Sequence, residues 1–360
     1  MKITDVKAYD LRYPLEVPFA NSQGWSRART AGVVEITTDA GITGWGEGLR
    51  AADRSVRDRL IGRDPTTTDV IWQGLSRGDI GAMSGVDIAL WDIAGKALDL
   101  PIHRLLGGAF RERIPAYASG LFMKDVPDAT RALEDEAKGY VDQGFPAVKM
   151  KIGFGRDYDT TNVSAIRRAI GPSIGFAVDA NCGYDVATAI DVGQRIVEHD
   201  LLWYEEPVPT DDVNGYVEIR RALKIAVAGG ESLQGLIAFR DLIQGRGLDI
   251  VQPDVSVAGG FSECRKVAAL ADANHVRVVP HMWGTAIRLA ATLHWQATIP
   301  DAPDMLTPVP PPFEFDMTEN RLRTDLAREP IRSEDGYVPV PKAPGLGIEI
   351  DREVLERYAV

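Results

Sequence analysis

The sequence predicts an α/β protein in which a (β/α)₈ barrel of parallel strands follows a smaller α+β unit. From Ile114 onward, short and nearly all-apolar runs alternate with longer amphipathic segments, which is typical of a parallel sheet covered by helices on both faces. Seven such units precede an eighth strand expected within residues 304–315, and this number fits a closed barrel better than an open doubly wound sheet. No G-x-G-x-x-G motif follows a strand run, so a dinucleotide-binding fold has little support.

The N-terminal part is expected to contain strands first and helices second. Residues 33–48 hold two β-rich runs around the turn residues 39–41, which indicates a hairpin. Residues 84–98 have helical periodicity with one buried face. The apolar residues spaced for that face are Val86, Leu90, Ile93 and Leu98. Strands followed by helices indicate an α+β unit over roughly the first 115 residues.

The barrel strands are expected where the apolar runs lie, with helices between them. The runs cover residues 114–120, 146–153, 174–181, 201–207, 224–231, 248–254 and 276–281. Residues 185–200 and 260–274 are the clearest of the intervening helical segments. Residues 300–312 contain six prolines and are predicted to form a loop, because proline removes a backbone donor and fixes φ. Residues 330–360 are predicted to form a tail of turns and a strand.

Composition excludes several kinds of partner. The formal net charge is −12 over 360 residues, which argues against nucleic acid or an anionic membrane surface as a partner.

The first residues lack the apolar region of a signal peptide, and no run of about 18 apolar residues is present. Cys182 and Cys264 cannot make a disulfide framework, so free thiols are expected. We therefore expect a cytoplasmic protein.

Six successive strand runs end in an ionisable residue. These residues are Lys151, Asp179, Glu205, Glu231, Asp254 and His281, at intervals of 28, 26, 26, 23 and 27 residues. Each interval matches one βα unit, and the carboxyl ends of barrel strands converge on one mouth, where the active sites of such barrels lie. The sequence therefore predicts an active site built from these six side chains.

Three of these residues predict a metal site. Asp179, Glu205 and Glu231 end adjacent strands, and carboxylates that close cannot all stay ionised without a positive partner. An all-oxygen set favours a hard divalent cation, Mg²⁺, and disfavours zinc. Pairing with arginine is the weaker alternative, because no arginine lies on these strand ends.

The remaining ionisable residues predict acid/base chemistry. Lys149 and Lys151 point to the same face of one strand and are expected to lower each other's pKa, which favours a general base. Asp254 is expected to accept from Nδ1 of His281 and so to provide a second acid/base group. Glu314 is the candidate polar residue of the eighth strand. A metal beside two bases suits removal of a proton α to a carboxylate, with the metal stabilising the enediolate.

With these residues in place, the chain resembles the mandelate racemase/muconate lactonizing enzyme branch of the enolase superfamily over essentially its whole length. The matching segments are GWGEG (44–48), SGVDIALWDIAGK (84–96), KMKIG (149–153), VDAN (178–181), WYEEP (203–207), GGE (229–231), QPD (252–254), PH (280–281) and EFD (314–316). The resemblance implies a modified TIM barrel over residues 116–329. It also implies an α+β capping domain over residues 1–115, completed by residues 330–360, and assembly into a homo-oligomer.

The resemblance also assigns roles to the site residues. It implies Asp179, Glu205 and Glu231 as Mg²⁺ ligands and Lys151 as the base on one face, with Lys149 beside it. The Asp254–His281 pair would act on the other face. Glu314 would correspond to the family's electrophilic carboxylic acid.

Within this branch, three segments resemble sugar-acid lactone enzymes of the galactarolactone cycloisomerase type. They are VPHMWGTAIRLAA (279–291), EFDMTEN (314–320) and GLGIEID (345–351). Such enzymes remove the proton α to a free carboxylate and expel the ring oxygen, which opens the lactone to a 3-deoxy-2-keto diacid. An acid-sugar dehydratase shares the first step but expels hydroxide. A metal-free Schiff-base aldolase and a non-catalytic sugar-acid binding protein remain as alternatives from other classes.

Substrate contacts are expected from the N-terminal unit and from residues beside the catalytic ones. Residues 19–25 are predicted to form a loop that is polar, aromatic and contains a glycine, which suits a lid over a polyol, with an ordinary surface loop as the alternative. Asn21 and Trp25 are the candidates there. Asn181 follows the metal-ligand candidate Asp179. Trp283, two residues after the predicted catalytic histidine, is expected either to line the pocket or to pack in the first turn of the following helix.

Overall fold

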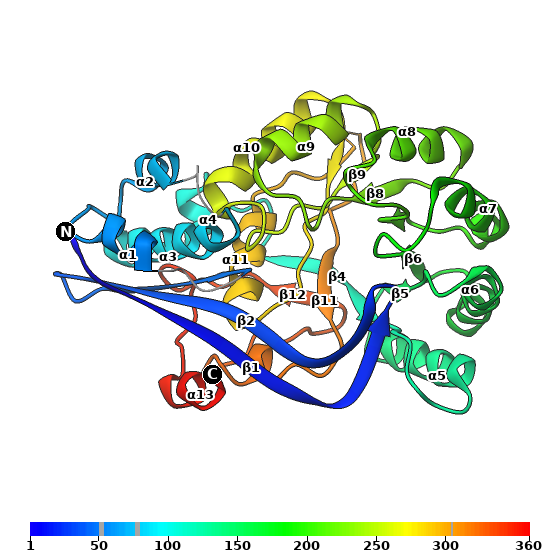
Figure 1. Cartoon of the computed structure of the whole chain (residues 1–360), viewed down its shortest axis with the longest axis horizontal. Helices are drawn as coiled ribbons and strands as arrows, with labels where there is room; N and C mark the ends of the chain where they lie inside the picture. The colour runs from blue at the N-terminus through cyan, green and yellow to red at the C-terminus, as the bar shows by residue number, and fades with distance from the viewer. Residues whose placement is uncertain (50–53, 76–79, 304) are drawn as a thin grey trace.

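A computed structural model describes residues 1–49, 54–75, 80–303 and 305–360. The chain begins with a three-stranded antiparallel sheet (Figure 1). Strand β1 (Ile3–Asn21) pairs with β2 (Gly24–Thr38), which pairs with β3 (Thr43–Gly48). The predicted hairpin over residues 33–48 is confirmed, because β2 and β3 are joined by a tight turn.

Helices follow this sheet in the chain. They are α1 (Arg54–Leu60), α2 (Thr68–Leu75), α3 (Ile80–Leu98) and α4 (Ile102–Leu105). Of these, α3 packs on β2 and β3, and α1 contacts β1. The predicted helix over residues 84–98 is confirmed within α3. The expectation of a single buried face is wrong, because α3 is buried on all sides from Gly81 to Gly95, between the sheet and a barrel helix. Leu98, in its last turn, is 61% exposed.

Strand β3 and helix α3 approach each other at backbone distance. A Cβ atom added at Gly46 would lie only 1.8 Å from the carbonyl oxygen of Gly85. The glycines of the GWGEG segment therefore permit the contact between sheet and helix. Glu47, between two of those glycines, is carried by the same strand and is almost completely buried.

Eight parallel strands form the barrel sheet in the order β10-β9-β8-β7-β6-β5-β4-β11. Their bounds are β4 (Arg113–Gly120), β5 (Ala147–Lys151), β6 (Gly175–Asp179), β7 (Tyr204–Glu205), β8 (Val227–Gly229), β9 (Ile250–Val251), β10 (Arg277–Val278) and β11 (Phe313–Asp316). The predicted fold class is confirmed. The eighth strand, expected within residues 304–315, lies at the end of that range.

A helix joins each strand of the barrel to the next. These helices are α5 (Ala129–Asp142), α6 (Arg156–Ile170), α7 (Val186–Ile196), α8 (Val213–Ala222), α9 (Gly235–Gln244), α10 (Gly260–Ala273) and α11 (Ala286–Ala297). The 3₁₀ helix η1 (Val197–His199) extends α7. The helix that directly follows β11 is α12 (Arg321–Thr324), which has four residues, so the last unit of the barrel is modified. The predicted proline-rich loop contains no helix or strand in its described residues up to Pro312, and Asp304 lies outside them.

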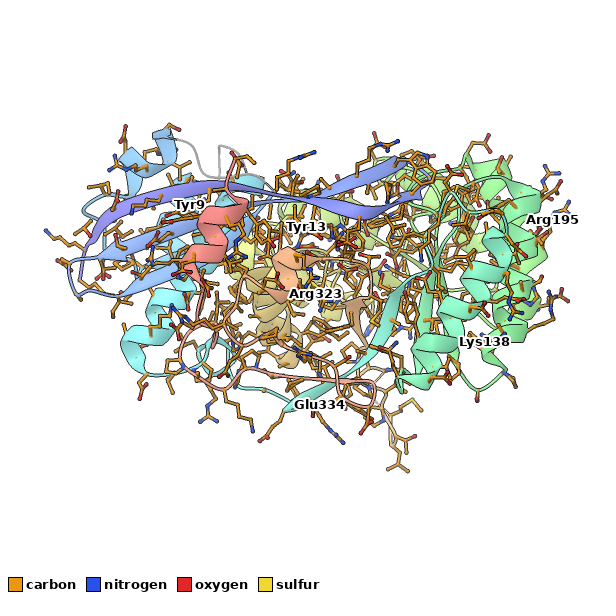
Figure 2. All side chains as sticks on the ribbon, turned by 90° about the horizontal axis from the view of Figure 1, so that it is seen from below. Tyr9, Tyr13, Lys138, Arg195, Arg323 and Glu334 are labelled. Atoms are coloured by element: carbon orange, nitrogen blue, oxygen red, sulfur yellow. The ribbon has the colours of Figure 1, made fainter. Side chains whose placement is uncertain are left out.

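The C-terminal tail returns to the N-terminal sheet. Strand β12 (Tyr337–Pro339) pairs with β4, and helix α13 (Arg352–Tyr358) packs on β1. The rings of Tyr13 and Tyr358 meet edge to face at 5.7 Å between centroids. Figure 2, with Tyr9 and Tyr13 labelled, shows the β1–β2 ribbon running from this region across to the barrel. None of the helices in the described ranges combines the length and the apolar character needed to cross a bilayer.

The far end of the β1–β2 ribbon lies against the carboxyl ends of the barrel strands. Ser22 Oγ donates to the carbonyl oxygens of Ala180 and Asn181 at 2.7 and 3.0 Å, and Gln23 Nε2 also donates to the latter. The expectation of a loop over residues 19–25 is wrong. This segment is the end of the β1–β2 hairpin, where the two strands stay paired up to a two-residue turn. Hydrogen bonds between the strands and to the barrel loop hold it in place.

Candidate active site

The structure brings together the six ionisable residues at the barrel mouth. Lys151, Asp179 and Glu205 are the last residues of β5, β6 and β7, and Glu231 follows β8 by two positions. The remaining pair, Asp254 and His281, follows β9 and β10 by three positions each. Parallel strands in neighbouring register place these positions at one edge of the sheet, so residues far apart in sequence become neighbours.

The three predicted metal ligands form a compact cluster. One carboxylate oxygen from each of Asp179, Glu205 and Glu231 lies within 4.8 Å of the other two. Burial raises the pKa of Glu205 to about 8, against the lowering effect of Lys149. Burial also disfavours the charge on Asp179, but Lys151 and Lys149 together outweigh it and hold its pKa below the ordinary value. Within the cluster, the two lysines thus favour the charge on Asp179, whereas burial disfavours the charge on Glu205.

Two buried lysines contact this cluster. Lys149 Nζ lies 2.5 Å from Glu205 Oε1, 2.8 Å from Glu314 Oε1 and 3.7 Å from Asp179 Oδ2, whereas Lys151 Nζ contacts Asp179 Oδ2 directly. The prediction that the two lysines have lowered pKa values is wrong when all their neighbours are taken together. Burial and Lys149 lower the pKa of Lys151, but Asp179 and the other carboxylates raise it further, to a value above the ordinary one.

The Asp254–His281 pair faces the cluster from another side. His281 Nδ1 lies 2.6 Å from Asp254 Oδ2, and its Nε2 lies 3.3 Å from Glu231 Oε2. Burial disfavours the charged form of Asp254, but Arg288 and His281 hold its pKa below the ordinary value. The carboxylate is thus ionised and only accepts, so Nδ1 of the imidazole donates and Nε2 faces the mouth. Burial lowers the pKa of His281, but Glu231 and Glu314 raise it to about 9.

Glu314 extends from β11 into the same mouth. It accepts from Ser119 Oγ at 2.7 Å and from the backbone N–H of Met282 at 3.1 Å, in addition to the contact with Lys149. Burial raises the pKa of Glu314, but Lys149 and His281 lower it well below the ordinary value. These neighbours favour the carboxylate, not the carboxylic acid that the resemblance implies.

The sequence reasoning missed several residues that hold the site. Trp203 Nε1 and Gln252 Nε2 donate to Glu205 Oε2 at 2.7 and 2.8 Å. A signal existed for Trp203, because it lies two positions before Glu205 in the predicted strand run 201–207, and residues two apart in extended chain point to the same face. Arg288 on α11, which donates to Asp254, had no such signal.

The predicted substrate-contacting residues divide into two groups. Asn181 Nδ2 donates to Glu231 Oε1 at 3.4 Å. Trp283 packs against Phe122 and Phe19, with ring centroids 5.3 and 6.0 Å apart, and Lys151 Nζ lies 5.2 Å from the Phe122 ring centroid. An aromatic wall thus adjoins the mouth.

The other two candidates are not brought to the mouth by contacts of this kind. Asn21 Oδ1 accepts from the backbone N–H of Gln23 within its own turn, and Trp25 is 45% exposed. These contacts place Asn181 and Trp283 beside the mouth, and they do not place Asn21 or Trp25 there.

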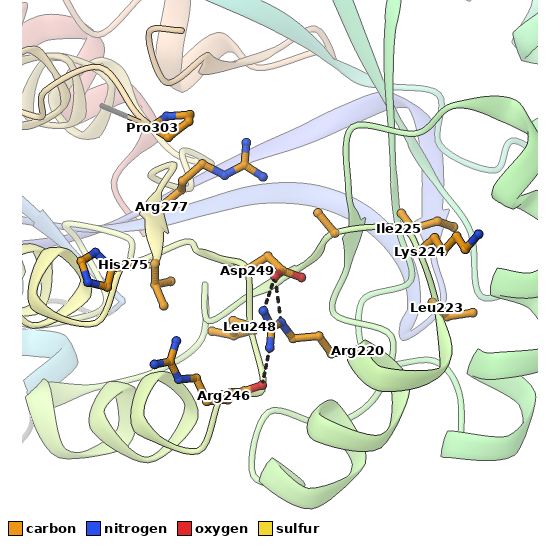
Figure 3. Close-up of a pocket in the computed structure, with 12 residues that line it drawn as sticks. Arg220, Leu223, Lys224, Ile225, Arg246, Leu248, Asp249, His275, Arg277 and Pro303 are labelled. Carbon is orange, nitrogen blue, oxygen red and sulfur yellow. Dashed lines mark hydrogen bonds and ion pairs between the residues drawn. The ribbon is translucent and has the colours of Figure 1, made fainter. Parts of the chain in front are cut away.

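Two of the cavities near the barrel bear on the position of the site. One of about 300 Å³ separates β2 from the segment that follows His281, and its lining includes Arg29 and Trp283. Another of about 670 Å³ lies where β8, β9 and β10 begin, at the end of the barrel away from the mouth (Figure 3). In Figure 3, Arg220 forms an ion pair with Asp249 at 2.7 Å inside this second cavity. The ionisable residues of the mouth therefore do not line this second cavity.

Comparison with known proteins identifies the family. Residues 3–107 match the N-terminal domain of mandelate racemase/muconate lactonizing enzymes, and residues 132–354 match the enolase C-terminal domain-like family. The chain is 40% identical to D-galactarolactone cycloisomerase of Agrobacterium fabrum, with 99% of both chains covered. It is 31% identical to arabinonate dehydratase of Saccharolobus solfataricus, over 90% of this chain and 89% of that one.

A solved structure supports the same assignment. A racemase from Streptomyces coelicolor, crystallised with bound magnesium, superposes with a TM-score of 0.86 at 31% identity, over 99% of this chain and 100% of that one. Matches in sequence and structure thus extend over both parts of the molecule. The chain belongs to the mandelate racemase/muconate lactonizing enzyme branch of the enolase superfamily, and it is an enzyme.

Proposed function

We propose that the protein opens the lactone of a sugar diacid by β-elimination, giving a 3-deoxy-2-keto diacid. The observation that carries this proposal is the position of two different acid/base groups around one carboxylate cluster. Lys151 contacts the cluster at Asp179, and His281 contacts it at Glu231. A substrate carboxylate held between them would present its α-carbon to both groups. The cycloisomerase relative, with 99% coverage of both chains, supports the lactone as substrate.

The donor set supports Mg²⁺ as the cofactor. Asp179, Glu205 and Glu231 offer only oxygen atoms, which suit a hard cation. Glu231 Oε2 is buried and accepts no hydrogen bond from the residues that the structure describes, and its ion-pair contact is with His281 Nε2 at 3.3 Å. A cation would therefore give this oxygen a partner that it lacks. Bound there, Mg²⁺ would offset the charge of the three carboxylates and stabilise the negative charge that develops on the substrate carboxylate. The magnesium-bound relative supports the same ion.

The chain's own residues would move the protons. Lys151 or His281, in its neutral form, takes the α-proton, and the C–H electron pair forms the double bond between the α- and β-carbons. The bond from the β-carbon to the ring oxygen breaks, and the oxygen leaves with the electron pair as a carboxylate. The other group then protonates the β-carbon of the enol, which becomes the 2-keto acid. Lys149, which Glu314 contacts at 2.8 Å, would offset the charge of the substrate carboxyl group during these steps.

The cap and the aromatic wall would select the substrate. We propose that residues 1–115 and 330–360 form the cap and residues 116–329 the barrel. Trp283 and Asn181 would contact the polyol part of the sugar acid. A sugar offers C–H faces to an aromatic ring and hydroxyl groups to an amide, so this combination suits a sugar acid.

A screen of aldarates, aldonates and their lactones with Mg²⁺, followed by mass spectrometry of the 2-keto acids formed, tests the proposal. We expect a product with the mass of the substrate lactone. Loss of water would instead assign acid-sugar dehydration, a second candidate that the dehydratase relative supports at 31% identity. Binding without deuterium exchange at the α-carbon in D₂O would contradict both reactions and indicate a binding protein.

A further inference from the structure

Arg288 lies behind the Asp254–His281 pair, in the first turn of α11. Its Nε donates to both oxygens of Asp254, at 2.8 and 2.9 Å, and its Nη2 contacts Oδ2, the oxygen that also accepts from His281. The backbone N–H of Ser256 donates to Oδ1 at 2.8 Å. Both oxygens of this fully buried carboxylate are thus held by donors other than the imidazole.

Glu47 connects this arginine to the N-terminal sheet. Its Oε2 accepts from the N–H and Oγ of Thr285 at 3.0 and 2.5 Å, and from the N–H of Arg288 at 3.3 Å. Thr285 is the N-cap of α11, and a carboxylate is favourable at a helix N-terminus because the backbone N–H groups there lack partners within the helix. Strand β3 therefore holds the start of the helix that carries Arg288.

Gly284 provides the space for this arrangement. A Cβ atom at position 284 would lie 2.3 Å from Glu47 Oε1 and 2.4 Å from Arg288 Cδ. Both distances are far below an ordinary contact. With a side chain at position 284, Glu47 and Arg288 would have to move from the positions described above.

We propose that Arg288 is a positioning residue for the Asp254–His281 pair, and that Glu47 makes this position depend on the docked N-terminal sheet. The proposal rests on the acid/base role of His281 proposed above. Because Arg288 and Ser256 fix the plane of the Asp254 carboxylate, they also fix the direction of the bond that orients the imidazole. Without Arg288 the buried carboxylate loses its permanent cationic partner and has to turn or take up a proton. In either case Nδ1 of His281 loses its fixed acceptor.

Two substitutions test the role of the guanidinium. Arg288→Met removes the ion pair at similar length, and Arg288→Lys keeps the charge without the fork of donors. With a substrate found by the screen, we expect kcat to fall about 10–100-fold in Arg288→Met with little change in KM, and to recover in part in Arg288→Lys. The matched control is Lys96→Met, which removes the partner of buried Asp92, 2.7 Å away on α3. It should lower the melting temperature and leave kcat unchanged.

A double-mutant cycle separates positioning from general damage. In a His281→Asn background no imidazole remains to be positioned, so adding Arg288→Met should change the residual kcat by less than about twofold. A loss as large as in the wild-type background would overturn the proposal, because Arg288 would then act independently of His281.

The Nδ1 proton of His281 gives a readout that needs no turnover. A donor 2.6 Å from a carboxylate oxygen should give a strongly downfield proton signal, assigned by its loss in His281→Asn. Arg288→Met and Glu47→Gln should shift or broaden this signal, and Arg288→Lys should preserve it in part. An unchanged signal in Arg288→Met would overturn the proposal. If no sugar acid is turned over, the proposed function fails, and this signal still decides the role of Arg288.

Discussion

The contact between Asp87 of α3 and Ser262 of α10 is expected to make the stability of the protein depend on pH. Asp87 is fully buried and accepts from the backbone N–H of Ser262 at 3.0 Å and from its Oγ at 2.6 Å. No cation is among the groups that shift its pKa most, so burial raises that pKa from 3.8 to about 7. Since a tenfold change in proton affinity corresponds to about 1.4 kcal/mol, the charge on Asp87 costs the folded state roughly 4 kcal/mol.

The direction of the pH dependence follows from the raised pKa. The folded state keeps the proton up to about pH 7, whereas the unfolded state loses it near 3.8. The stabilisation is therefore complete below the unfolded value and is lost as the pH rises through about 7. Asp87→Asn keeps a neutral group that can accept from the N–H of Ser262 and donate to its Oγ. The variant should therefore gain stability relative to the wild type as the pH rises.

Thermal unfolding at pH 5 and at pH 8 measures this effect. Between these two values the difference between Asp87→Asn and the wild type should grow by roughly 3 kcal/mol, which corresponds to roughly 5 °C in melting temperature. The control is Asp125→Asn at an exposed position, which should show no such growth. An equal difference between Asp87→Asn and the wild type at both pH values would refute the reasoning, because burial would then not control the protonation of Asp87.

Three further expectations concern the mouth and its support. Glu231→Gln should weaken Mg²⁺ binding at least about tenfold, measured by calorimetry, because it removes a charged ligand. The control Glu218→Gln, on an exposed face of α8, should leave the affinity for Mg²⁺ unchanged. Equal affinities of the two variants would contradict the metal assignment. Lys151→Ala and His281→Asn should each lower kcat by about 10²–10⁴-fold, and full activity in both would remove the acid/base proposal. Gly46→Ala should lower the melting temperature, since its Cβ would lie 1.8 Å from a backbone oxygen of α3, and an unchanged temperature would show that the strand can shift freely.

Much of the fold could be predicted because its signals are local. Apolar runs bounded by turn residues mark buried parallel strands, and each barrel strand lies in or next to its predicted run. Two errors arise because contacts with residues outside the segment decide its structure or burial. Leu98 has the spacing of a core residue, but it lies in the last turn of α3 beyond the neighbours that bury the rest of the helix. Residues 19–25 have the composition of a loop, but pairing between β1 and β2 continues almost to the turn.

The sequence by itself determined which residues meet at the mouth. Parallel strands end at the same edge of a sheet, so the regular spacing of Lys151, Asp179, Glu205 and the residues that follow them was enough to bring them together. Only the tertiary structure decided their charge states and their support. The pKa of Lys151 depends on the distance to Asp179, and Asp254 is held by Arg288 from a helix. Such effects vary with separation and burial in three dimensions, which the linear order of residues does not record.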